Sequence, residues 1–498
     1  MHFELGLKKR DKKNNPTLFE EKKILYYEKN IGYDSAFSKK LLLDNPKDIF
    51  YECNSYYLFD KNDPKMYVKD IIRLSPQEKG LFKKFFEFVK DINNKENDFQ
   101  KYFDSFLLSK KIKLDRDQYK YIFKLIDYEI NGFGPLMPLI EDKELIEEIA
   151  VIGLGVDLPV YVYVANVGWT KTNIYFTDEE YVKELINKMA RSIGRQISIN
   201  YPILNASLPD GSRLNAIISP ISDKYPLITL RKFKANPLTP INLINYNTIS
   251  EDIATFLWLS MLTDSNILIA GNTGSGKTTT LNAILSFVPK SERIVLCEET
   301  PEVNIPHKHK AKLKVDPKKN IGMTELITST LRMRPDRLVV GEIRTKEEVC
   351  AFIDTVLAGQ GKGSYATFHA LSVNDAIERL LKLGMLEQDL NALDLIIIQR
   401  RWNIIDFETK KQKEIRKIVE IAELIDKKPK TIYKYNYDKK VWDKINESKR
   451  IKNKIEIVFN REFNIVFNKY KSNLEKIKYK KQNIEDFFIS VNNLWDIK

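Results

Sequence analysis

The chain contains 498 residues, more than one compact core usually holds, so we expect two to four domains. Hydrophobic residues make up 43% of the sequence and charged residues 30%, a composition that excludes an intrinsically disordered protein. The net charge of +13 agrees with binding to nucleic acid or to an anionic membrane surface, and a Lys-, Asn- and Ile-rich bias along the whole chain explains it equally well.

The cysteines and one apolar stretch indicate the cellular compartment in which the protein is expected. Cys53, Cys297 and Cys350 are too few for a disulfide framework or a four-cysteine zinc site, which favours a reducing cytoplasm. The N-terminal residues lack the apolar segment of a signal peptide. The apolar stretch at 253–270 is interrupted at 264–266 and falls short of the ~20 residues that span a membrane, so it predicts a buried helix followed by a buried strand.

Residues 1–130 predict a Lys-rich, partly helical accessory region. Residues 75–78 (Ser-Pro-Gln-Glu) form a capping box with proline at the first helical position. The apolar residues that follow share one helix face: Leu81, Phe82, Phe85, Phe86 and Val89. A second helix is expected at 119–130, and the Asn-Gly-Phe-Gly-Pro sequence at 131–135 ends it.

Residues 131–234 predict a compact α/β domain, because the apolar pattern changes from helical to alternating within it. The expected elements, in chain order, are a strand at 160–164, a turn at Gly168, a strand at 173–176, a helix at 179–193, a turn at 208–213 between short strands, and a final strand at 227–233.

Residues 235–425 predict a second α/β domain behind a linker at 236–240. Short apolar runs alternate with helices here, which is typical of βαβ units and a largely parallel sheet. The expected parallel strands are at 267–270, 294–297, 338–340 and 364–367, with antiparallel strands at the sheet edge at 395–399 and 418–421. Residues 426–498 predict a basic C-terminal extension with a hairpin and amphipathic helices.

A complete phosphate-binding loop, G-x-x-x-x-G-K-[ST], follows the strand at 267–270 and precedes a helix expected at 277–287. Its glycines let backbone N–H groups converge on phosphate oxygens, and the helix N-terminus favours negative charge. We expect Lys277 to reach the β- and γ-phosphates of ATP and the Thr278 hydroxyl to bind Mg²⁺. The predicted nucleotide-binding residues are Gly271, Asn272, Thr273, Gly274, Ser275, Gly276, Lys277, Thr278 and Thr279.

Carboxylates follow two further strands of this domain. Glu298 and Glu299 end one apolar strand, and Glu342 follows another. Doubly wound sheets bind their ligands at the carboxyl ends of strands. Hydrolysis of ATP needs one carboxylate that orients or deprotonates water and another near Mg²⁺. The domain is therefore expected to hydrolyse ATP as well as bind it.

Three segments behind the phosphate loop resemble motifs of the type II/type IV secretion ATPase superfamily, in the order of that family. Residues 298–302 (EETPE) resemble its Asp box, residues 334–344 (RPDRLVVGEIR) its Walker B region, and residues 363–370 (GSYATFHA) its His box. Four upstream segments resemble the N-terminal domain of the archaeal branch: 132–136, 172–174, 208–213 and 231–233. The resemblance covers residues 131 to 425.

This resemblance implies a RecA-like P-loop ATPase domain, preceded by a smaller α/β domain of PAS-like fold and flanked by helical accessory ends. It implies that Glu298 is the catalytic base for water, that Glu342 lies near Mg²⁺, directly or through water, and that His369 senses the γ-phosphate. Arg213 and Arg231 match arginines of the N-terminal domain that reach the nucleotide, a role that suits the charged, forked guanidinium group.

Four positions depart from the family pattern, and none of them is a residue that hydrolysis requires. Glu299 stands in place of an aspartate, and Asn205 stands in place of an acidic residue. Gln360 and Lys362 lie where many members carry a Thr-Gly-His sequence.

Histidines are few, which limits the metal chemistry that the sequence can support. The chain contains His2, His307, His309 and His369, so a His-rich metal site is not expected. His307 and His309 flank a lysine and are predicted to be solvated loop residues.

By the same resemblance, the protein is expected to be the ATP-hydrolysing motor of a type II secretion, type IV pilus or archaeal flagellum-like machine. The implied assembly is a homo-oligomer, a hexameric ring, that moves a polytopic membrane platform protein and, through it, a pilin-like or secreted substrate. Its expected location is the cytoplasm, at the inner face of the cell membrane. The linker at 236–239 is the expected hinge on which the first α/β domain closes over ATP.

Two other functions fit part of the sequence. A nucleic-acid motor for DNA transfer or packaging agrees with the fold and the charge, but the sequence has no zinc finger, no RNA-recognition signature and no evident aromatic–basic stretch outside the tails. No specific nucleic acid is therefore expected. A nucleotide-gated structural ring with little turnover predicts that Glu298→Gln leaves function intact.

Overall fold

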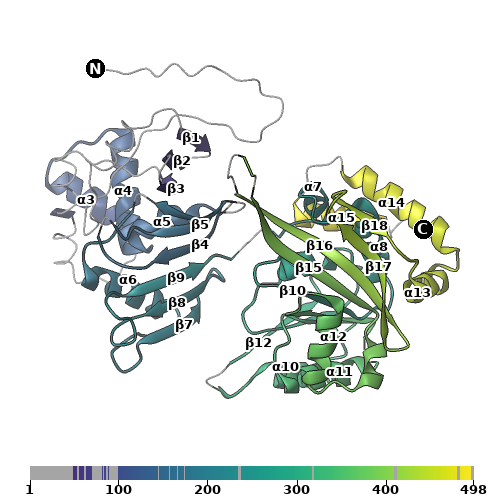
Figure 1. The fold of residues 1–498 in the computed structure, drawn as a ribbon. Coiled ribbons are helices and arrows are strands. Elements are labelled where there is room, and N and C mark those ends of the chain that lie inside the picture. The colour runs from purple at the N-terminus through teal and green to yellow at the C-terminus, as the bar shows by residue number, and fades with distance from the viewer. Residues whose placement is uncertain are drawn as a thin grey trace, which may run out of the picture. The chain divides into compact units, whose positions relative to one another are not determined.

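The computed structural model describes the strands at 49–52, 55–60 and 63–69, residues 81, 84, 85 and 88, and residues 99–494 apart from 144, 156, 165–166, 173, 234–236, 317–318, 360, 406, 409–411 and 479–482. The expected capping box at 75–78, Phe82, Phe86, Val89, Cys53 and Gln360 lie outside these residues. The chain divides into two compact units, Met1–Phe233 and Lys234–Lys498, where the sequence predicted four regions. Both units combine helices with a large sheet, in agreement with the predicted α/β class (Figure 1).

The first unit is built on a sheet of nine strands. Their order is β1 (Ile49–Glu52), β2 (Ser55–Asp60), β3 (Asp63–Lys69), β6 (Gly168–Thr172), β5 (Tyr161–Val164), β4 (Ile146–Val151), β9 (Leu227–Arg231), β8 (Arg213–Ile217) and β7 (Ile203–Ser207). Neighbouring strands are antiparallel except β3 and β6, which pair in parallel. The strands β1, β2 and β3, which the sequence did not predict, thus extend the sheet of the α/β domain.

Helices of the accessory region share one core with this sheet. The helical elements are α3 (Phe99–Ser109), α4 (Arg116–Ile130), the 3₁₀ turn η1 (Gly134–Leu136), α5 (Met137–Glu141) and α6 (Glu179–Arg191). Phe85, Phe103 and Phe106 are fully buried in the same cluster as the sheet residues Val162 and Leu230. The helices α4 and α6 lie where the sequence predicted them. At the start of α6 the Asp178 carboxylate accepts the Glu180 N–H, which caps the helix.

The second hairpin strand of this unit differs from the prediction. It is β6, Gly168–Thr172, and not the expected strand at 173–176, because the hairpin turn comes before Gly168, whose φ is +98°. The strand was not predicted because its buried residues Thr170 and Thr172 are polar, so the segment lacks the alternation of apolar residues that indicates a strand. The Thr172 hydroxyl is satisfied by the Val160 carbonyl, 2.8 Å away.

The second unit is built on another sheet of nine strands. Their order is β12 (Lys310–Lys314), β11 (Ile294–Glu298), β13 (Arg337–Val340), β14 (Gly363–Phe368), β10 (Ile267–Gly271), β15 (Leu395–Ile405), β16 (Gln412–Ile425), β17 (Lys428–Asn436) and β18 (Val441–Lys444). The six strands from β12 to β15 are mutually parallel, and β16, β17 and β18 continue the sheet in antiparallel pairs.

The assignment of residues 395–399 to an antiparallel edge strand is therefore wrong. Leu395–Gln399 begin β15, which pairs in parallel with β10 and lies inside the sheet. The four residues from Leu395 to Ile398 are all buried, as expected of an interior strand covered on both faces. The antiparallel assignment is right for 418–421, which form part of β16.

Helices cover both faces of this sheet. One set comprises α7 (Pro240–Asn245), α8 (Glu251–Met261), α9 (Lys277–Leu285), α13 (Lys449–Phe459), α14 (Phe463–Lys478) and α15 (Ile484–Asn493). The other set comprises α10 (Met323–Thr330), α11 (Lys346–Leu357), α12 (Val373–Lys382) and the 3₁₀ turn η3 (Glu387–Ala392). Ile267 and Ile269 of β10 belong to the core of the first set, and Leu268 and Ala270 belong to that of the second. This alternation across a fully buried strand explains the unbroken apolar run in the sequence.

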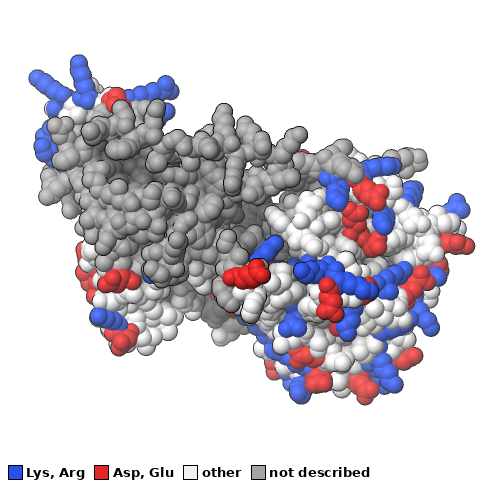
Figure 2. Space-filling view, turned by 45° about the horizontal axis from the view of Figure 1, so that its top comes forward, with Lys and Arg blue, Asp and Glu red and all other residues white. Residues whose placement is uncertain are grey.

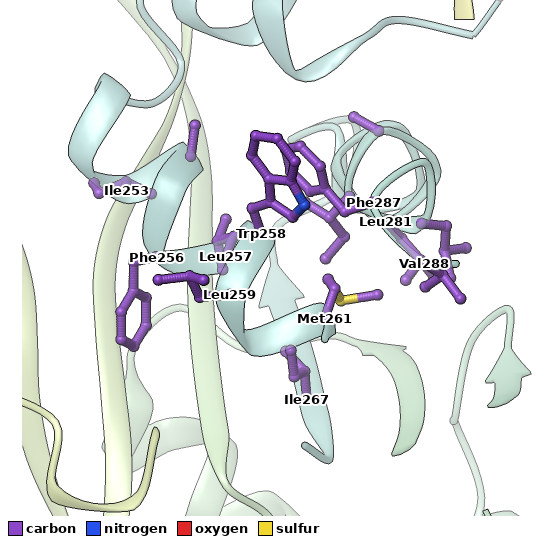
Figure 3. Packing of buried hydrophobic residues seen from close by; sticks show 14 of the residues in the cluster. Ile253, Phe256, Leu257, Trp258, Leu259, Met261, Ile267, Leu281, Phe287 and Val288 are labelled. Carbon is purple, nitrogen blue, oxygen red and sulfur yellow. The ribbon is translucent and has the colours of Figure 1, made fainter. Parts of the chain in front are cut away.

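The apolar stretch at 253–262 is a buried helix, as predicted. Within α8, every residue from Ile253 to Met261 is buried, and Trp258 stacks on Phe287 with ring centroids 5.0 Å apart (Figure 3). Within the part of the chain that the structure describes, none of the helices combines the length and the apolar character that a membrane span requires.

The C-terminal residues belong to the second unit and are fixed to its sheet. The buried Glu423 carboxylate of β16 accepts hydrogen bonds from the Ser448 hydroxyl (2.7 Å) and from the N–H groups of Lys449 and Arg450 (both 3.1 Å) at the start of α13. An anionic acceptor at a helix N-terminus is stabilising. The hairpin and helices expected after residue 426 are thus continuous with the sheet.

Charged residues of both signs are interspersed on the face of the second unit shown in Figure 2. A nucleic-acid groove would gather lysine and arginine into one stripe. On this face, the described residues form no such stripe.

His307 is buried, which corrects the prediction that it is solvated. Its side chain is 1% exposed, its Nε2 lies 2.9 Å from the Val288 carbonyl, and its ring lies 4.4 Å from that of Phe488 in α15. The C-terminal helix therefore covers the loop that the sequence placed in solvent. Burial lowers the pKa of His307 to about 4. His309 is exposed, as predicted.

We expect His307 to make the protein acid-sensitive. Its pKa is about 4 in the fold against 6.5 for an unperturbed histidine, so the unfolded chain binds more protons in between. Its stabilising contribution is complete above pH 6.5 and is lost as the pH falls towards 4, by about 2–3 kcal/mol at pH 4.5. Urea unfolding of the whole chain at pH 7 and 4.5 should show a correspondingly smaller loss for His307→Gln than for the exposed control His309→Gln. Equal losses would contradict the assignment.

Candidate functional site

The phosphate loop joins β10, in the middle of the second sheet, to α9, which begins at Lys277. Gly274 and Gly276 have φ angles of +71° and +95°, a region that favours glycine. A side chain at Gly271 would also be impossible, because its Cβ would lie 2.0 Å from the Gln399 carbonyl oxygen. The glycines are therefore required for the loop to curl and for its backbone N–H groups to surround a phosphate.

Two side chains of the loop indicate an anion as its ligand. Lys277 is only 8% exposed, and its Nζ donates to the Gly271 and Asn272 carbonyls at 3.1 and 3.3 Å. The buried Ser275 hydroxyl has no hydrogen-bond partner among the described residues. A buried ammonium and an unsatisfied hydroxyl beside converging N–H groups fit a polyphosphate.

The sheet brings the predicted catalytic residues to the same edge as this loop. The strands β11, β13, β14 and β10 are parallel neighbours, so their carboxyl ends lie side by side. Glu298 is the last residue of β11, Glu342 comes two residues after β13, and His369 directly follows β14. Residues that are 71 positions apart in the chain (298 to 369) thereby meet at one sheet edge.

Glu298 is held rigidly at the end of β11. It is 2% exposed, and its Oε1 accepts the N–H groups of Glu302 and Val303 at 2.7 and 2.8 Å. Burial raises the pKa of Glu298 and outweighs the opposing effect of these two hydrogen bonds. A carboxylate with a raised pKa is a stronger base than a solvated one, which suits proton abstraction.

His369 and Glu342 are in direct contact. The His369 Nε2 lies 2.8 Å from a Glu342 carboxylate oxygen. Burial, and next the positive charge of Lys277, lower the pKa of His369, so the imidazole is neutral near pH 7 and its Nε2–H donates to Glu342.

The structure adds Arg344 to this cluster. Its Nε donates to the Glu342 carboxylate at 2.6 Å, and its Nη1 pairs with Glu299. Arg344 thus links the carboxylates at the ends of β11 and β13. The sequence showed this arginine inside the Walker B-like segment but gave it no role, because its two partners are separated by more than forty residues in the chain.

The other wall of the loop is formed by β15, which the sequence did not connect with the site. The Gln399 side chain accepts a hydrogen bond from the Thr280 hydroxyl of α9 at 2.7 Å. The Asn272 side chain exchanges two hydrogen bonds with the backbone of Arg401, both 2.9 Å long. The only signal in the sequence was the run of polar residues, Gln-Arg-Arg, that follows the buried part of the strand.

Arg213 and Arg231 lie in the first unit, on neighbouring strands. They are directly opposite each other across the β8–β9 pair. The Arg231 side chain is 52% exposed, and its Nε lies 3.7 Å from Glu148. The Glu148 carboxylate therefore compensates part of the positive charge that the two opposed arginines bring together.

Three of the positions that depart from the family pattern, Asn205, Glu299 and Lys362, are among the described residues. The Asn205 amide oxygen accepts a hydrogen bond from the Asn215 side chain of β8 at 2.7 Å. Lys362 precedes β14, at the opposite end of that strand from His369, and its Nζ lies 3.3 Å from Glu292. Lys362 therefore cannot replace a group of the cluster around Glu342.

Comparison with known proteins identifies the family of this chain. A family model described as type II/IV secretion system protein matches residues 131–484. An uncharacterised protein of Methanocaldococcus jannaschii is 43% identical over 222 residues, which are 42% of this chain and 30% of that protein. The chain spans less than half the length of this relative and of a second protein of the same organism.

Proteins of secretion machines are also similar. The type IV secretion system protein VirB11 of Bartonella henselae is 32% identical over 270 residues, 43% of this chain and 75% of that protein. Among solved structures, the pilus retraction motor PilT with bound ADP aligns with 72% of this chain and 96% of its own at 18% identity and a TM-score of 0.44. The match to the family model over most of the chain is decisive: the chain belongs to the type II/IV secretion system protein family.

Proposed function

We propose that the second unit binds ATP with Mg²⁺ and hydrolyses it to ADP and phosphate, and that the protein is the motor of a secretion, pilus or archaeal flagellum-like machine. The observation that carries the proposal is the convergence of the phosphate loop, Glu298 and the Glu342–His369 pair at one edge of a parallel sheet. Family membership supports it.

Each residue has a role that its surroundings support. The loop amides and Lys277 bind the phosphates, and buried Glu298 accepts the proton of the attacking water. His369, neutral and hydrogen-bonded to Glu342, contacts the γ-phosphate and reports its presence to that carboxylate. Glu342 helps to hold Mg²⁺, directly or through water.

The residues present fit a magnesium ion that is bound largely by the nucleotide. The described residues contain no group of three or more His, Cys, Asp or Glu side chains able to hold a metal alone. Thr278 in the first turn of α9 and Glu342, directly or through water, would hold Mg²⁺ together with phosphate oxygens. When bound, the ion neutralises charge that develops on the phosphates.

The two-unit organisation supports a mechanical function. We infer that Arg213 and Arg231 of the first unit contact bound nucleotide, within one chain or across a subunit boundary, so that hydrolysis changes the arrangement of the units about residues 236–239. The proposed assembly is a hexameric ring at the cytoplasmic face of the membrane, with a polytopic platform protein as its partner and a pilin-like or secreted protein as the indirect substrate.

Lys277→Ala tests the nucleotide site directly. Loss of the buried ammonium removes a charge-assisted hydrogen bond to phosphate, so ATP affinity should fall by about 10- to 100-fold. Isothermal calorimetry with ATP and Mg²⁺ measures this, with Lys382→Ala, an exposed lysine in the last turn of α12, as the matched control. ATP binding equal to wild type in Lys277→Ala would refute the site.

The same preparation tests the competing nucleic-acid motor. The net charge of +13 is the observation that favours it. ATP hydrolysis that rises with added DNA and loses this stimulation steeply with salt would identify a nucleic-acid motor. The proposed secretion motor predicts a rate that DNA leaves unchanged.

A further inference from the structure

Arg401 lies against the phosphate loop on the side away from the catalytic carboxylates. A Cβ at Gly274 would be 2.3 Å from the Arg401 Nη1 and 3.4 Å from its Cζ, so the guanidinium covers the middle of the loop. The backbone pairing of β10 with β15 ends at Gly271 and Gln399. Beyond this point, two hydrogen bonds between the Asn272 side chain and the Arg401 backbone hold Arg401 beside the loop.

The orientation of the guanidinium is set from the opposite side by a buried carboxylate. The Arg401 Nε donates to Glu414 of β16 at 2.7 Å, and Glu414 is 8% exposed. Arg416, the cross-strand partner of Arg401, contacts the other oxygen of Glu414, also at 2.7 Å. The Arg401 side chain itself is 30% exposed.

The strand order determines which part of a nucleotide this arginine can contact. The water-activating and γ-phosphate groups, Glu298, Glu342 and His369, follow strands on the β14 side of β10. Arg401 is on β15, the neighbour on the other side of β10. A triphosphate whose γ-phosphate points to the β14 side therefore presents its α- and β-phosphates to β15.

We propose that Arg401 is a further nucleotide-binding residue, which donates to the α- or β-phosphate and is held in position by Glu414. The inference rests on the proposed function of the phosphate loop. A guanidinium stays charged at all relevant pH values and presents several N–H donors in a fixed plane, so one edge can bind Glu414 while another faces phosphate. Because both phosphates are common to ATP and ADP, Arg401 contributes equally to the binding of both nucleotides, whereas His369 distinguishes them.

The test compares three variants of the full chain by calorimetry with ATP and with ADP, each with Mg²⁺. Arg401→Gln should weaken both nucleotides by the same factor, about tenfold, as expected for one charge-assisted hydrogen bond. Arg401→Lys should fall between this variant and wild type, because it keeps the charge and loses the planar fork. Arg416→Gln is the matched control: it loses a guanidinium from the same carboxylate and should bind both nucleotides within about twofold of wild type.

The outcomes separate this proposal from the function on which it rests. Wild-type protein that binds neither nucleotide refutes both. Wild-type binding together with unchanged binding by Arg401→Gln refutes the role of Arg401 alone, as does a loss confined to ATP. An equal loss in Arg416→Gln would show that the arginines only support Glu414. If Arg401→Gln does not fold, judged by circular dichroism, the comparison of Arg401→Lys with Arg416→Gln decides: binding by Arg401→Lys equal to wild type refutes the proposal.

Discussion

Glu298→Gln should abolish most ATP hydrolysis while ATP still binds. The substitution removes the basic carboxylate but keeps an oxygen that can accept the Glu302 and Val303 N–H groups, so the end of β11 should keep its shape. General-base catalysis contributes about 10²–10⁴-fold, and we expect phosphate release to fall by about 10³-fold. Phosphate release at saturating ATP and calorimetric ATP affinity are the two measurements.

The neighbouring carboxylate provides the matched control. Glu299 belongs to the same strand end but pairs with Arg344, and Glu299→Gln should retain hydrolysis within about tenfold of wild type. Hydrolysis by Glu298→Gln at the wild-type rate would show that another group activates water. It would also favour the nucleotide-gated ring, in which turnover is unimportant. Loss of ATP binding in Glu298→Gln would instead point to a role in binding.

The nucleotide edge of the second sheet could be predicted because its strands are short, continuous apolar runs, each followed by a polar residue. Ile294 to Cys297 and Leu338 to Val340 are buried on both faces of the sheet. Such apolar runs predict strands, and Glu298 and Glu342 are therefore predicted at the ends of these strands. The order of the strands in the sheet is not encoded in any one run. Only the structure shows that β14, with His369 behind it, separates the loop strand β10 from β13.

Residues whose environment is created by distant segments could not be predicted. The sequence predicts that His307 is a solvated loop residue. In the structure it is buried, because α15, some 180 positions further along the chain, packs over it. In the sequence Arg401 is the polar end of a predicted strand, and it lies against the phosphate loop because β15 is the parallel neighbour of β10. Strand β12, Lys-Ala-Lys-Leu-Lys, carries little apolar signal since it lies at the sheet edge.

Arg337→Met should be the most destabilising of the substitutions considered, at about 3–5 kcal/mol, although Arg337 lies in the Walker B-like segment. Its guanidinium is buried at the start of β13, the end away from the nucleotide. It donates to Glu292 at 2.6 Å, to the carbonyls of Thr263 and Lys362 at 2.8 and 2.7 Å, and to the Tyr365 hydroxyl at 2.8 Å. Among the described residues, methionine would leave the Glu292 carboxylate, 8% exposed, with the half-exposed Lys362 as its one remaining cationic partner.

Two further variants distinguish the effect of losing the Arg337 side chain from the effect of leaving Glu292 without its ion-pair partner. In Arg337→Met with Glu292→Leu the orphaned carboxylate is also removed, so most of the lost stability should return. Arg332→Met, at an exposed arginine five residues upstream, should change the free energy of unfolding by less than about 0.5 kcal/mol. Urea unfolding of the full chain measures all three. A double variant no more stable than Arg337→Met would show that the hydrogen bonds to Thr263, Lys362 and Tyr365 matter more than the ion pair.

The position of Arg337 also predicts what its loss leaves intact. Strand β13 runs from Arg337 to Val340, and Glu342 follows it at the edge of the sheet that carries the phosphate loop. The buried arginine that stabilises the sheet and the carboxylate proposed to lie near Mg²⁺ are therefore at opposite ends of one short segment. At a temperature where Arg337→Met is still folded, its ATP affinity should equal that of wild type, whereas Lys277→Ala should lose affinity without losing stability. Reduced ATP affinity in folded Arg337→Met would mean that the buried ion pair sets the geometry of the nucleotide edge as well as the stability of the sheet.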